Sequence, residues 1–525
     1  MLKKSIAASI LISALASNSY AQVDPVAVKY SSYIDTISAR KHLSILASDE
    51  FEGRETGKPG AAKAANYLAE EFKRLGLAAP VNGSYFQKVG LEEKALKFKS
   101  FTVNGKPLVY LQDFYARSVA KPVSINTSEI VFVGYGISDA KYDDLKGLDI
   151  KGKVVMVINY GEPSKNGTFT ITGTKENSEW SKNINKRFDL LRSKQPALIL
   201  AVNERLAAYL QTNKGHVGES VLGLKKEQAT APAATPIIQI TNAAADQFLK
   251  PTGKTFAAIQ KQIDTSGKPA SRVIKVRFNT MFGSQSKDVE AVNVMGYLEG
   301  SDLKDEVLVL SAHYDHVGLN PAGPDKVFNG ADDDGSGTTG VLELAEAFTQ
   351  AKKEGKGPRR SILFLLVVGE EKGLLGSEWY SDHPVFPLKN TITDLNIDMI
   401  GRVDPLHKAD PNYCYLIGSD KLSTDLHKIS ENANSTYTNL KIDYKYNDPN
   451  DPERIYYRSD HYNFAKHGIP IIFYFNGVHE DYHQVGDEVS KIDFPMLVKR
   501  ASLVYYTAWN LVQRAKAPVV DVHKD

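Results

Sequence analysis

The sequence predicts an α/β fold in which a doubly wound, mostly parallel sheet domain is interrupted by an inserted β-rich domain. From residue 290 onward, strand-like segments alternate with helix-like segments along the chain. The strand segments, such as "EVLVLSAH" and "SILFLLVV", are continuous apolar runs, which are typical of sheets covered on both faces. Between residues 113 and 275 the chain shows short β-rich pieces separated by Gly, Pro and Asn, which indicates a separate module.

The length and composition describe a globular protein of more than one domain. At 525 residues, with 42% apolar and 24% charged residues, the chain is too long for a single hydrophobic core. We predict a main domain from residues 22–112 and 276–525 and an inserted domain from residues 113–275. The 64 Lys and Arg residues nearly balance the 62 Asp and Glu residues, so we expect no nucleic-acid partner. The oligomeric state is not readable from the sequence.

The first residues, "MLKKSIAASILISALASNSYAQ", have the pattern of a secretory signal peptide. Two lysines precede a mostly apolar stretch from Ile6 to Ala16, and small residues precede a cleavage point at Gln22. About eleven apolar residues cannot cross a hydrocarbon core of ~30 Å, so we expect no stable membrane insertion. We therefore predict a signal peptide at residues 1–21 and export to the periplasm or the extracellular space.

Helical periodicity predicts the main helices. Residues 36–77 indicate two helices joined by a polar, Gly-containing loop, and Gly76 occupies the position of a left-handed C-cap after the second. A further helix is predicted through Val341 and Phe348, after the first strand of the main sheet. The only cysteine, Cys414, lies in the strand-like segment "NYCYLIG", which predicts a buried, inert thiol and excludes an internal disulfide.

Acidic residues and histidines follow or end several of the predicted strands. Doubly wound sheets gather their sites just beyond the carboxyl ends of their strands, so we expect these side chains to share one site. They are His313, Asp315 and His316 after "EVLVLSA", Asp332, Asp333 and Asp334 in the next loop, Glu370 and Glu371 after "LFLLVVG", Asp398 in "LNIDMIG", and His479, His483 and Asp487 after "IPIIFYF".

Such a cluster predicts a metal site. Without a cation the carboxylates would repel one another, whereas a divalent metal makes the same cluster favourable. Imidazole and carboxylate donors without thiolate suit zinc, with cobalt and manganese as less favoured occupants. The donors exceed the three protein ligands of a single catalytic zinc, so two metals are better supported than one.

The adjacent glutamates Glu370 and Glu371 predict a division of roles. Neighbouring side chains in an extended segment point to opposite sides. One carboxylate can therefore bind metal while the other holds a water molecule and acts as general base, later giving its proton to the leaving group.

Together these motifs resemble the secreted bacterial di-zinc aminopeptidases, part of a zinc peptidase superfamily that also contains glutamate carboxypeptidase, glutaminyl cyclase and the transferrin receptor. The resemblance runs in order through "SAHYDHVG", "NGADDDGSGT", "GEEKGLLGS", "NIDMIGR", "RSDHYNFAKHGIP" and "DYHQVGDE". Residues 113–275 are similar to the protease-associated domain that is inserted in many members, especially at "IVFVGYGI".

The resemblance implies two Zn²⁺ per chain. His313 and Asp398 would hold one Zn²⁺, Glu371 and His483 would hold the other, and Asp333 would bridge them.

The resemblance also implies roles for residues around the metals. Glu370 would be the general base, and Asp315, two residues after the first ligand, would orient that ligand's imidazole. Asp460, His461 and Asp487 lie in matching motifs and are predicted to fix loops rather than to take part in the chemistry.

The activity implied is that of an aminopeptidase, which hydrolyses N-terminal residues from peptides through a water molecule that bridges the metals. A carboxypeptidase or dipeptidase of the same superfamily stays open, and it would need a cation such as Arg402 or Arg458 for the terminal carboxylate. A glutaminyl cyclase, with one zinc, also stays open. The last alternative is a non-catalytic, receptor-like binding protein, although all five ligand positions and the base position carry competent residues.

Overall fold

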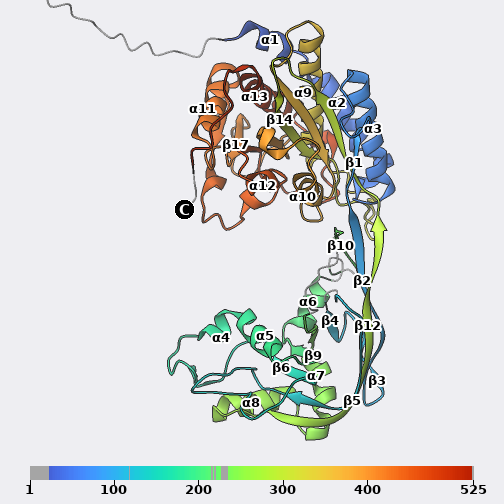
Figure 1. Ribbon diagram of the computed structural model, residues 1–525, viewed down its shortest axis with the longest axis vertical. Helices are drawn as coiled ribbons and strands as arrows, with labels where there is room; N and C mark the ends of the chain where they lie inside the picture. The colour runs from blue at the N-terminus through green and yellow to red at the C-terminus, as the bar shows by residue number, and fades with distance from the viewer. Residues whose placement is uncertain (1–22, 117–118, 214–216, 218–219, 226–233, 523–525) are drawn as a thin grey trace, which may run out of the picture. The chain divides into compact units, whose positions relative to one another are not determined.

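The computed structural model describes residues 23–116, 119–213, 217, 220–225 and 234–522. The predicted signal peptide, residues 1–21, lies outside the described residues. The chain divides into two compact units, the first formed by residues 1–90 and 290–525 and the second by residues 91–289 (Figure 1).

The second unit extends beyond the predicted insert, residues 113–275, at both ends. Its first strand is β2 (Leu91–Val103) and its last is β12 (Arg272–Val289), and these two long strands pair with each other. Because they form one sheet with the strands between them, the boundaries of the unit fall outside the predicted ones. That this unit is a protease-associated domain stays a prediction.

Within the described residues, the first unit is built on an eight-stranded sheet, and this confirms the predicted α/β class. The pairs β15·β14, β14·β16 and β16·β19 at its centre are parallel, whereas β1·β13, β13·β15 and β17·β19 are antiparallel. In sheet order the strands are β1 (Phe86–Lys88), β13 (Val292–Leu298), β15 (Arg360–Val367), β14 (Leu303–His313), β16 (Thr391–Ile397), β19 (Ile471–Phe475), β17 (Tyr413–Ile417) and β18 (Lys441–Asp443).

Helices cover both faces of this sheet. Leu363 of β15 belongs to the same hydrophobic cluster as Tyr380 and Phe464, whereas the ring of Phe364, on the opposite face, lies 6.3 Å from that of Phe72. Every residue of β15 is buried, as its apolar run predicts. The α-helices of the first unit are α1 (Pro25–Ser31), α2 (Thr36–Leu46), α3 (Pro59–Leu75), α9 (Gly335–Lys353), α10 (Leu375–Asp382), α11 (Thr424–Ala433), α12 (His461–Ala465) and α13 (Phe494–Gln513).

Two local predictions are confirmed in this unit. Helix α3 ends at Leu75, and Gly76 adopts φ 82° while its N–H donates to the backbone oxygen of Lys73. A left-handed residue of this kind satisfies a carbonyl at a helix end. Cys414 lies in β17 and is a buried free thiol.

The second unit is a mixed α/β unit and not simply β-rich as predicted. The pairs β5·β6, β6·β9 and β9·β11 of its sheet are parallel, and parallel neighbours need crossover connections, which helices supply. In sheet order its strands are β10 (Ser220–Leu224), β2, β12, β5 (Val123–Phe132), β6 (Val154–Ile158), β9 (Leu198–Val202), β11 (Ile237–Ile240) and β4 (Phe114–Ala116), with β3 (Lys106–Pro107) beside β2; β7 (Ser164–Lys165) pairs with β8 (Thr168–Phe169).

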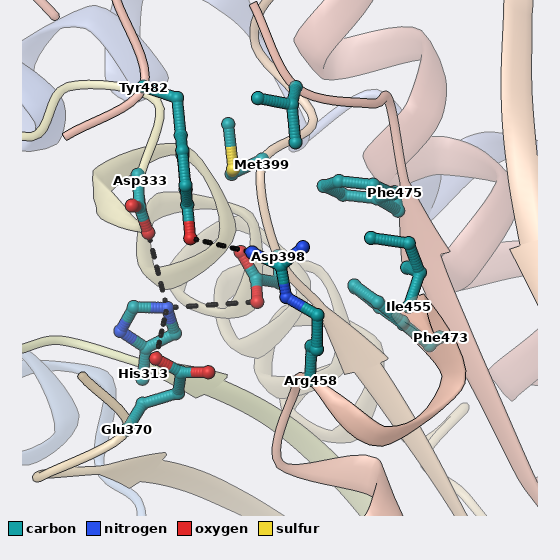
Figure 2. A pocket seen from close by; sticks show the side chains of 11 residues that line it. His313, Asp333, Glu370, Asp398, Met399, Ile455, Arg458, Phe473, Phe475 and Tyr482 are labelled. Atoms are coloured by element: carbon teal, nitrogen blue, oxygen red, sulfur yellow. Dashed lines mark hydrogen bonds and ion pairs between the residues drawn. The ribbon is translucent and has the colours of Figure 1, made fainter. Parts of the chain in front are cut away.

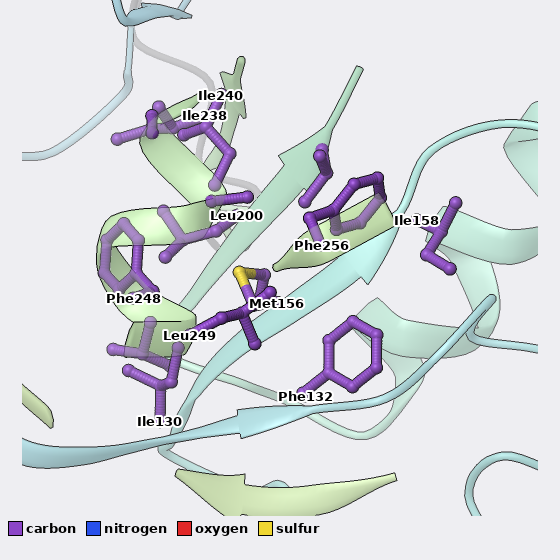
Figure 3. Packing of buried hydrophobic residues seen from close by; sticks show 14 of the residues in the cluster. Ile130, Phe132, Met156, Ile158, Leu200, Ile238, Ile240, Phe248, Leu249 and Phe256 are labelled. Atoms are coloured by element: carbon purple, nitrogen blue, oxygen red, sulfur yellow. The ribbon is translucent and has the colours of Figure 1, made fainter. Parts of the chain in front are cut away.

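The helices of the second unit pack on its sheet. Figure 3 shows Met156 and Leu200 of the parallel strands beside Phe248 and Phe256 of two helices, and all four are fully or almost fully buried. The helices are α4 (Glu179–Lys182), α5 (Ile184–Ser193), α6 (Leu206–Thr212), α7 (Asn242–Leu249) and α8 (Phe256–Ser266).

Across the described part of both units, the helices are too short or too polar for any of them to cross a membrane.

Candidate metal centre

Four neighbouring strands of the first unit deliver acidic and imidazole side chains to one edge of the sheet. β14 ends at His313, β15 is followed by Glu370 and Glu371, β16 is followed by Asp398, and β19 leads into the loop that carries His483. Because β15, β14, β16 and β19 are adjacent and parallel, their carboxyl ends lie together. Sheet order therefore unites residues that are far apart in the chain.

The first group of donor atoms surrounds Nε2 of His313 (Figure 2). This nitrogen lies 3.4 Å from Asp333 Oδ1 and 3.7 Å from Asp398 Oδ2, and Glu370 Oε2 is farther away at 4.0 Å. The side chains of His313, Asp333 and Asp398 are buried, and each offers a donor atom within 4.8 Å of the others. These three residues can therefore hold one metal ion.

A second group of donors lies on the other oxygen of Asp333. Nε2 of His483 is 3.1 Å from Asp333 Oδ2 and 3.0 Å from Glu371 Oε2. Nδ1 of His316 also approaches this group, 3.0 Å from Glu371 Oε1 and 3.7 Å from Asp333 Oδ2. One carboxylate oxygen of Asp333 thus faces each group, which is the arrangement that a bridging ligand requires.

Unpartnered polar atoms indicate that these residues fit metal ions. Asp333 Oδ2, Asp398 Oδ1 and His483 Nε2 are buried but have no hydrogen-bond partner among the described residues. Such an atom costs about 1–3 kcal/mol when it is left unsatisfied, and a bound cation would satisfy it. Imidazole and carboxylate donors without thiolate match zinc. The structure brings all five predicted ligands together, and their binding of metal stays a prediction.

Burial and neighbouring charges raise the pKa of Glu370. Burial has the largest effect, His313 acts in the opposite direction, and the carboxylates of Glu371 and Asp398 raise the pKa further, to well above its ordinary value. Burial and the neighbouring carboxylates therefore disfavour the charged form of Glu370. A cation nearby would stabilise the charged carboxylate and so lower the pKa of Glu370.

The imidazoles have the opposite influence on Asp333. Burial raises its pKa, but His313 and His483 hold the pKa of Asp333 well below its usual range. In turn, burial lowers the pKa of His483, while Asp333 and Glu371 raise it to about 10. The carboxylates of Asp333 and Glu371 thus stabilise positive charge on His483.

Asp315 connects the first donor to the base position, but not quite as predicted. Nδ1 of His313 donates to the backbone oxygen of Asp315 at 3.1 Å and lies 3.7 Å from its carboxylate. The carboxylate instead accepts the backbone N–H of Glu370 at 3.2 Å and the hydroxyl of Thr56 at 2.6 Å. The main chain of Asp315 is therefore the nearer partner of the imidazole, and its carboxylate fixes the segment that carries Glu370.

The three consecutive aspartates have three different surroundings. Asp332 Oδ1 accepts the backbone N–H of Gly401 at 2.6 Å, and Asp334 Oδ1 accepts that of Met399 at 3.1 Å. Asp333 is the one whose carboxylate faces the donor groups. Asp332 and Asp334 thus attach the loop to the segment after β16, and the other oxygen of Asp332 lies 3.3 Å from Nε2 of His479. Among the three, Asp333 is the one that faces both donor groups.

Asp487, Asp460 and His461 make the loop-fixing contacts predicted for them. Asp487 Oδ2 accepts the backbone N–H of Asp333 at 3.0 Å. Asp460 accepts the hydroxyl of Ser377, and burial raises its pKa to about 7. His461 donates from Nε2 to a backbone oxygen of the preceding turn at 2.8 Å.

Arg54 is a buried residue of the site region that sequence reasoning missed. Its guanidinium donates to the backbone oxygens of Leu46, Tyr314, Asn329 and Gly330 at 2.7–2.8 Å. It therefore attaches the N-terminal segment to the chain that follows β14. Arginine is mostly exposed in proteins, so only the surrounding motif "FEGRETG" could have singled it out.

A pocket with both polar and apolar walls adjoins the first donor group (Figure 2). Glu370, Tyr482 and Arg458 are among its lining residues, and Arg458 Nη2 donates to the Tyr482 hydroxyl at 3.3 Å. The pocket is lined by His313, Asp333, Glu370, Asp398, Met399, Ile455, Arg458, Phe473, Phe475, Val478 and Tyr482.

The two candidate cations for a substrate carboxylate have different surroundings. Arg402 forms ion pairs with Asp481 at 2.7 Å and with Glu480 at 3.6 Å. Arg458 is exposed and lines the pocket. The structure thus places Arg458, and not Arg402, where a ligand could meet it.

The chain is similar to curated peptidases over part of its length. A 213-residue segment is 29% identical to a probable leucine aminopeptidase of Trichophyton verrucosum, covering 39% of this chain and 54% of that protein. A 111-residue segment is 33% identical to the aminopeptidase YwaD of Bacillus subtilis, covering 21% of this chain and 22% of that protein. Relatives therefore occur in fungi and bacteria. The chain spans about half, or less, of the length of these relatives.

The fold is similar to that of a solved aminopeptidase from Aneurinibacillus sp. strain AM-1. The TM-score is 0.50 at 16% sequence identity, covering 95% of this chain and 98% of that structure. At this identity the likeness concerns the fold alone.

A family match coincides with the candidate centre. Each predicted ligand lies between His313 and His483, in the segment that follows the inserted unit. This segment, residues 293–508, matches the family described as Peptidase family M28.

Proposed function

We propose that the chain is a zinc-dependent exopeptidase of peptidase family M28, and specifically an aminopeptidase that removes N-terminal residues from peptides. The observation that carries this proposal is the position of Asp333 between two histidines. Its Oδ1 lies 3.4 Å from Nε2 of His313, and its Oδ2 lies 3.1 Å from Nε2 of His483. A carboxylate shared between two donor groups is the feature that a two-metal hydrolytic site needs. The family match over residues 293–508 and the names of the relatives support it.

The five proposed ligands divide between two Zn²⁺. His313 and Asp398 would hold one ion, Glu371 and His483 the other, and Asp333 both. Bound Zn²⁺ would polarise the scissile carbonyl and make water more acidic.

Glu370 is the proposed general base. Its carboxylate lines the pocket and lies farther from His313 Nε2 than the two proposed ligand carboxylates do. In the ionised form, its oxygen accepts a proton from the attacking water and later donates that proton to the leaving amine. Asp315 holds the backbone of Glu370 in place for both transfers.

A carboxypeptidase or dipeptidase remains the second candidate, because Arg458 lines the pocket and forms no ion pair with a described acidic residue. A guanidinium in this position could pair with a terminal carboxylate. Substrates with one terminus blocked separate the two candidates.

The test joins metal analysis with a small substrate panel. We expect the purified mature chain to contain two zinc ions, to lose hydrolysis of leucine amide after chelation, and to regain it when zinc is returned. N-acetyl-leucine amide, which has no free amine, should not be cleaved. Cleavage of an N-blocked dipeptide in place of leucine amide would favour the carboxypeptidase. One zinc and cyclisation of an N-terminal glutamine would favour a glutaminyl cyclase.

We also propose that the protein is exported through residues 1–21. The pattern of two lysines, a short apolar stretch and small residues supports this proposal. N-terminal sequencing of the mature protein should begin at Gln22, and a retained Met1 would count against it.

A further inference from the structure

His316 is a buried histidine that the sequence places in the donor cluster, in "SAHYDHVG", but to which the resemblance assigns no role. Its side chain is fully buried, and Nδ1 donates a hydrogen bond to Glu371 Oε1 at 3.0 Å. Its ring lies edge-on to that of His483, with 5.7 Å between the ring centroids. His316 thus stands at the second donor group, where it could be either a metal ligand or the partner of one.

The orientation of the two imidazoles separates these possibilities. Nε2 of His483 lies 3.0 Å from Glu371 and 3.1 Å from Asp333, but it has no hydrogen-bond partner among the described residues. Both distances are short enough for hydrogen bonds, and a cation held among these three atoms would satisfy the unpartnered nitrogen. Nδ1 of His316 has donor atoms of Asp333 and Glu371 within reach of a shared ion, but it lies closer to Glu371 Oε1, at 3.0 Å, than to Asp333 Oδ2, at 3.7 Å, and its one hydrogen bond to a described side chain is to Glu371.

We propose that His316 is a positioning residue, which donates its Nδ1–H to Glu371 Oε1 and so turns Oε2 toward the second cation. The proposal rests on the proposed two-zinc function. A carboxylate ligand that is fixed by a hydrogen bond pays less conformational entropy on binding metal. The three protein ligands of the second cation are then Asp333, Glu371 and His483, without His316.

The backbone beside His316 is shaped to admit its ring. Gly330 adopts φ 58°, and a Cβ atom built on it would lie 2.5 Å from Cδ2 of His316. A larger residue could not stand there without moving the imidazole away from Glu371. The absence of a side chain at this position therefore keeps the hydrogen bond in place.

Two substitutions at His316 and one control test the proposal. His316→Asn keeps an N–H donor near the position of Nδ1, whereas His316→Leu removes the donor. His42→Leu is the matched control, because His42 is also buried in the first unit but bonds to the hydroxyl of Tyr67 at 2.6 Å, away from the donor groups. The readouts are zinc affinity, measured by competition with a chelator, and the visible absorption of the cobalt-loaded protein.

We expect His316→Leu to weaken the binding of one zinc about 10- to 100-fold, while His316→Asn and His42→Leu bind both ions as the wild type does. The cobalt spectrum of His316→Asn should match that of the wild type, because no ligand is lost. Unchanged affinity in His316→Leu, or a spectrum that changes in His316→Asn as if a nitrogen ligand had been removed, would overturn the positioning role alone. A wild-type protein that binds no zinc would overturn the proposed function and this role with it.

Discussion

Glu370 and Glu371 are consecutive in the chain, but their carboxylates face different groups. Glu371 Oε2 lies 3.0 Å from Nε2 of His483, whereas Glu370 Oε2 lies 4.0 Å from Nε2 of His313 and faces the pocket. The separation arises in a turn rather than in the strand, because β15 ends at Val367 and Gly369 has φ 81°. One carboxylate is thereby close enough to an imidazole to share a cation, and the other is left for proton transfer.

This separation predicts different outcomes for the two conservative substitutions. Glu370→Gln should lower kcat for leucine amide by about 10²- to 10⁴-fold, because proton transfer is lost, and should leave both zinc ions bound. Glu371→Gln, the contrast variant, should lose zinc as well as activity. Metal analysis beside steady-state kinetics checks both. Turnover of Glu370→Gln within tenfold of the wild type would exclude the base role.

Arg54→Lys should destabilise the protein by about 2–4 kcal/mol. Lysine cannot make all the hydrogen bonds that Arg54 makes to four backbone oxygens, and buried acceptors left unsatisfied are costly. Urea unfolding followed by intrinsic fluorescence measures the change in the free energy of unfolding.

Arg74→Lys is the control for the arginine experiment. Arg74 is half exposed and pairs with Glu71 at 2.7 Å, so its replacement should change the free energy of unfolding by less than about 1 kcal/mol. Equal effects at the two positions would show that the backbone contacts of Arg54 contribute little.

Arg458→Met should alter the preference for charged substrates. Arg458 lines the pocket, so it should repel a lysine side chain there. We expect the ratio of kcat/KM for lysine amide to that for leucine amide to rise about tenfold, which corresponds to ~1.4 kcal/mol. Arg402→Met is the control, because Arg402 is paired with Asp481, and this ratio should stay constant even if overall activity falls. A constant ratio in Arg458→Met would mean that its charge does not reach the substrate.

Glu343 predicts a pH dependence of stability. It is buried on α9 and accepts the backbone N–H of Asp35 at 3.0 Å, and burial raises its pKa to about 7. Because the folded-state pKa lies above the unfolded value of about 4.3, the folded protein holds this proton more tightly. The contribution to stability is full below about pH 4 and is lost as the pH rises to about 7.

Glu343→Gln tests this dependence, because glutamine retains an acceptor for Asp35 and does not ionise. The variant should be more stable than the wild type at pH 8, by up to about 4 kcal/mol, and the difference should vanish near pH 4. Paired urea unfolding curves at the two pH values provide the measurement. A difference that is the same at both would contradict a raised pKa.

Much of the first unit was predictable because its signals are local. The continuous apolar run of β15 requires cover on both faces, and Leu363 and Phe364 do pack against helices on opposite faces. The C-cap at Gly76 is likewise set by a single residue and its neighbours. The second unit was harder to predict. Its strands β2 and β12 pair although almost the whole unit lies between them in the sequence, and no local pattern predicts such a distant partner.

The sequence by itself determined which strands are buried and which donor residues stand at their ends. Both signals are local, because they depend only on the residue types within each segment. Only the tertiary structure decided that Asp333 and neither of its neighbours faces two imidazoles, that the main chain of Asp315 is the nearer partner of His313, and that His316 bonds to Glu371. These pairings are contacts of 3–4 Å between residues that are distant in the chain. They are fixed by the order in which β15, β14, β16 and β19 pack side by side.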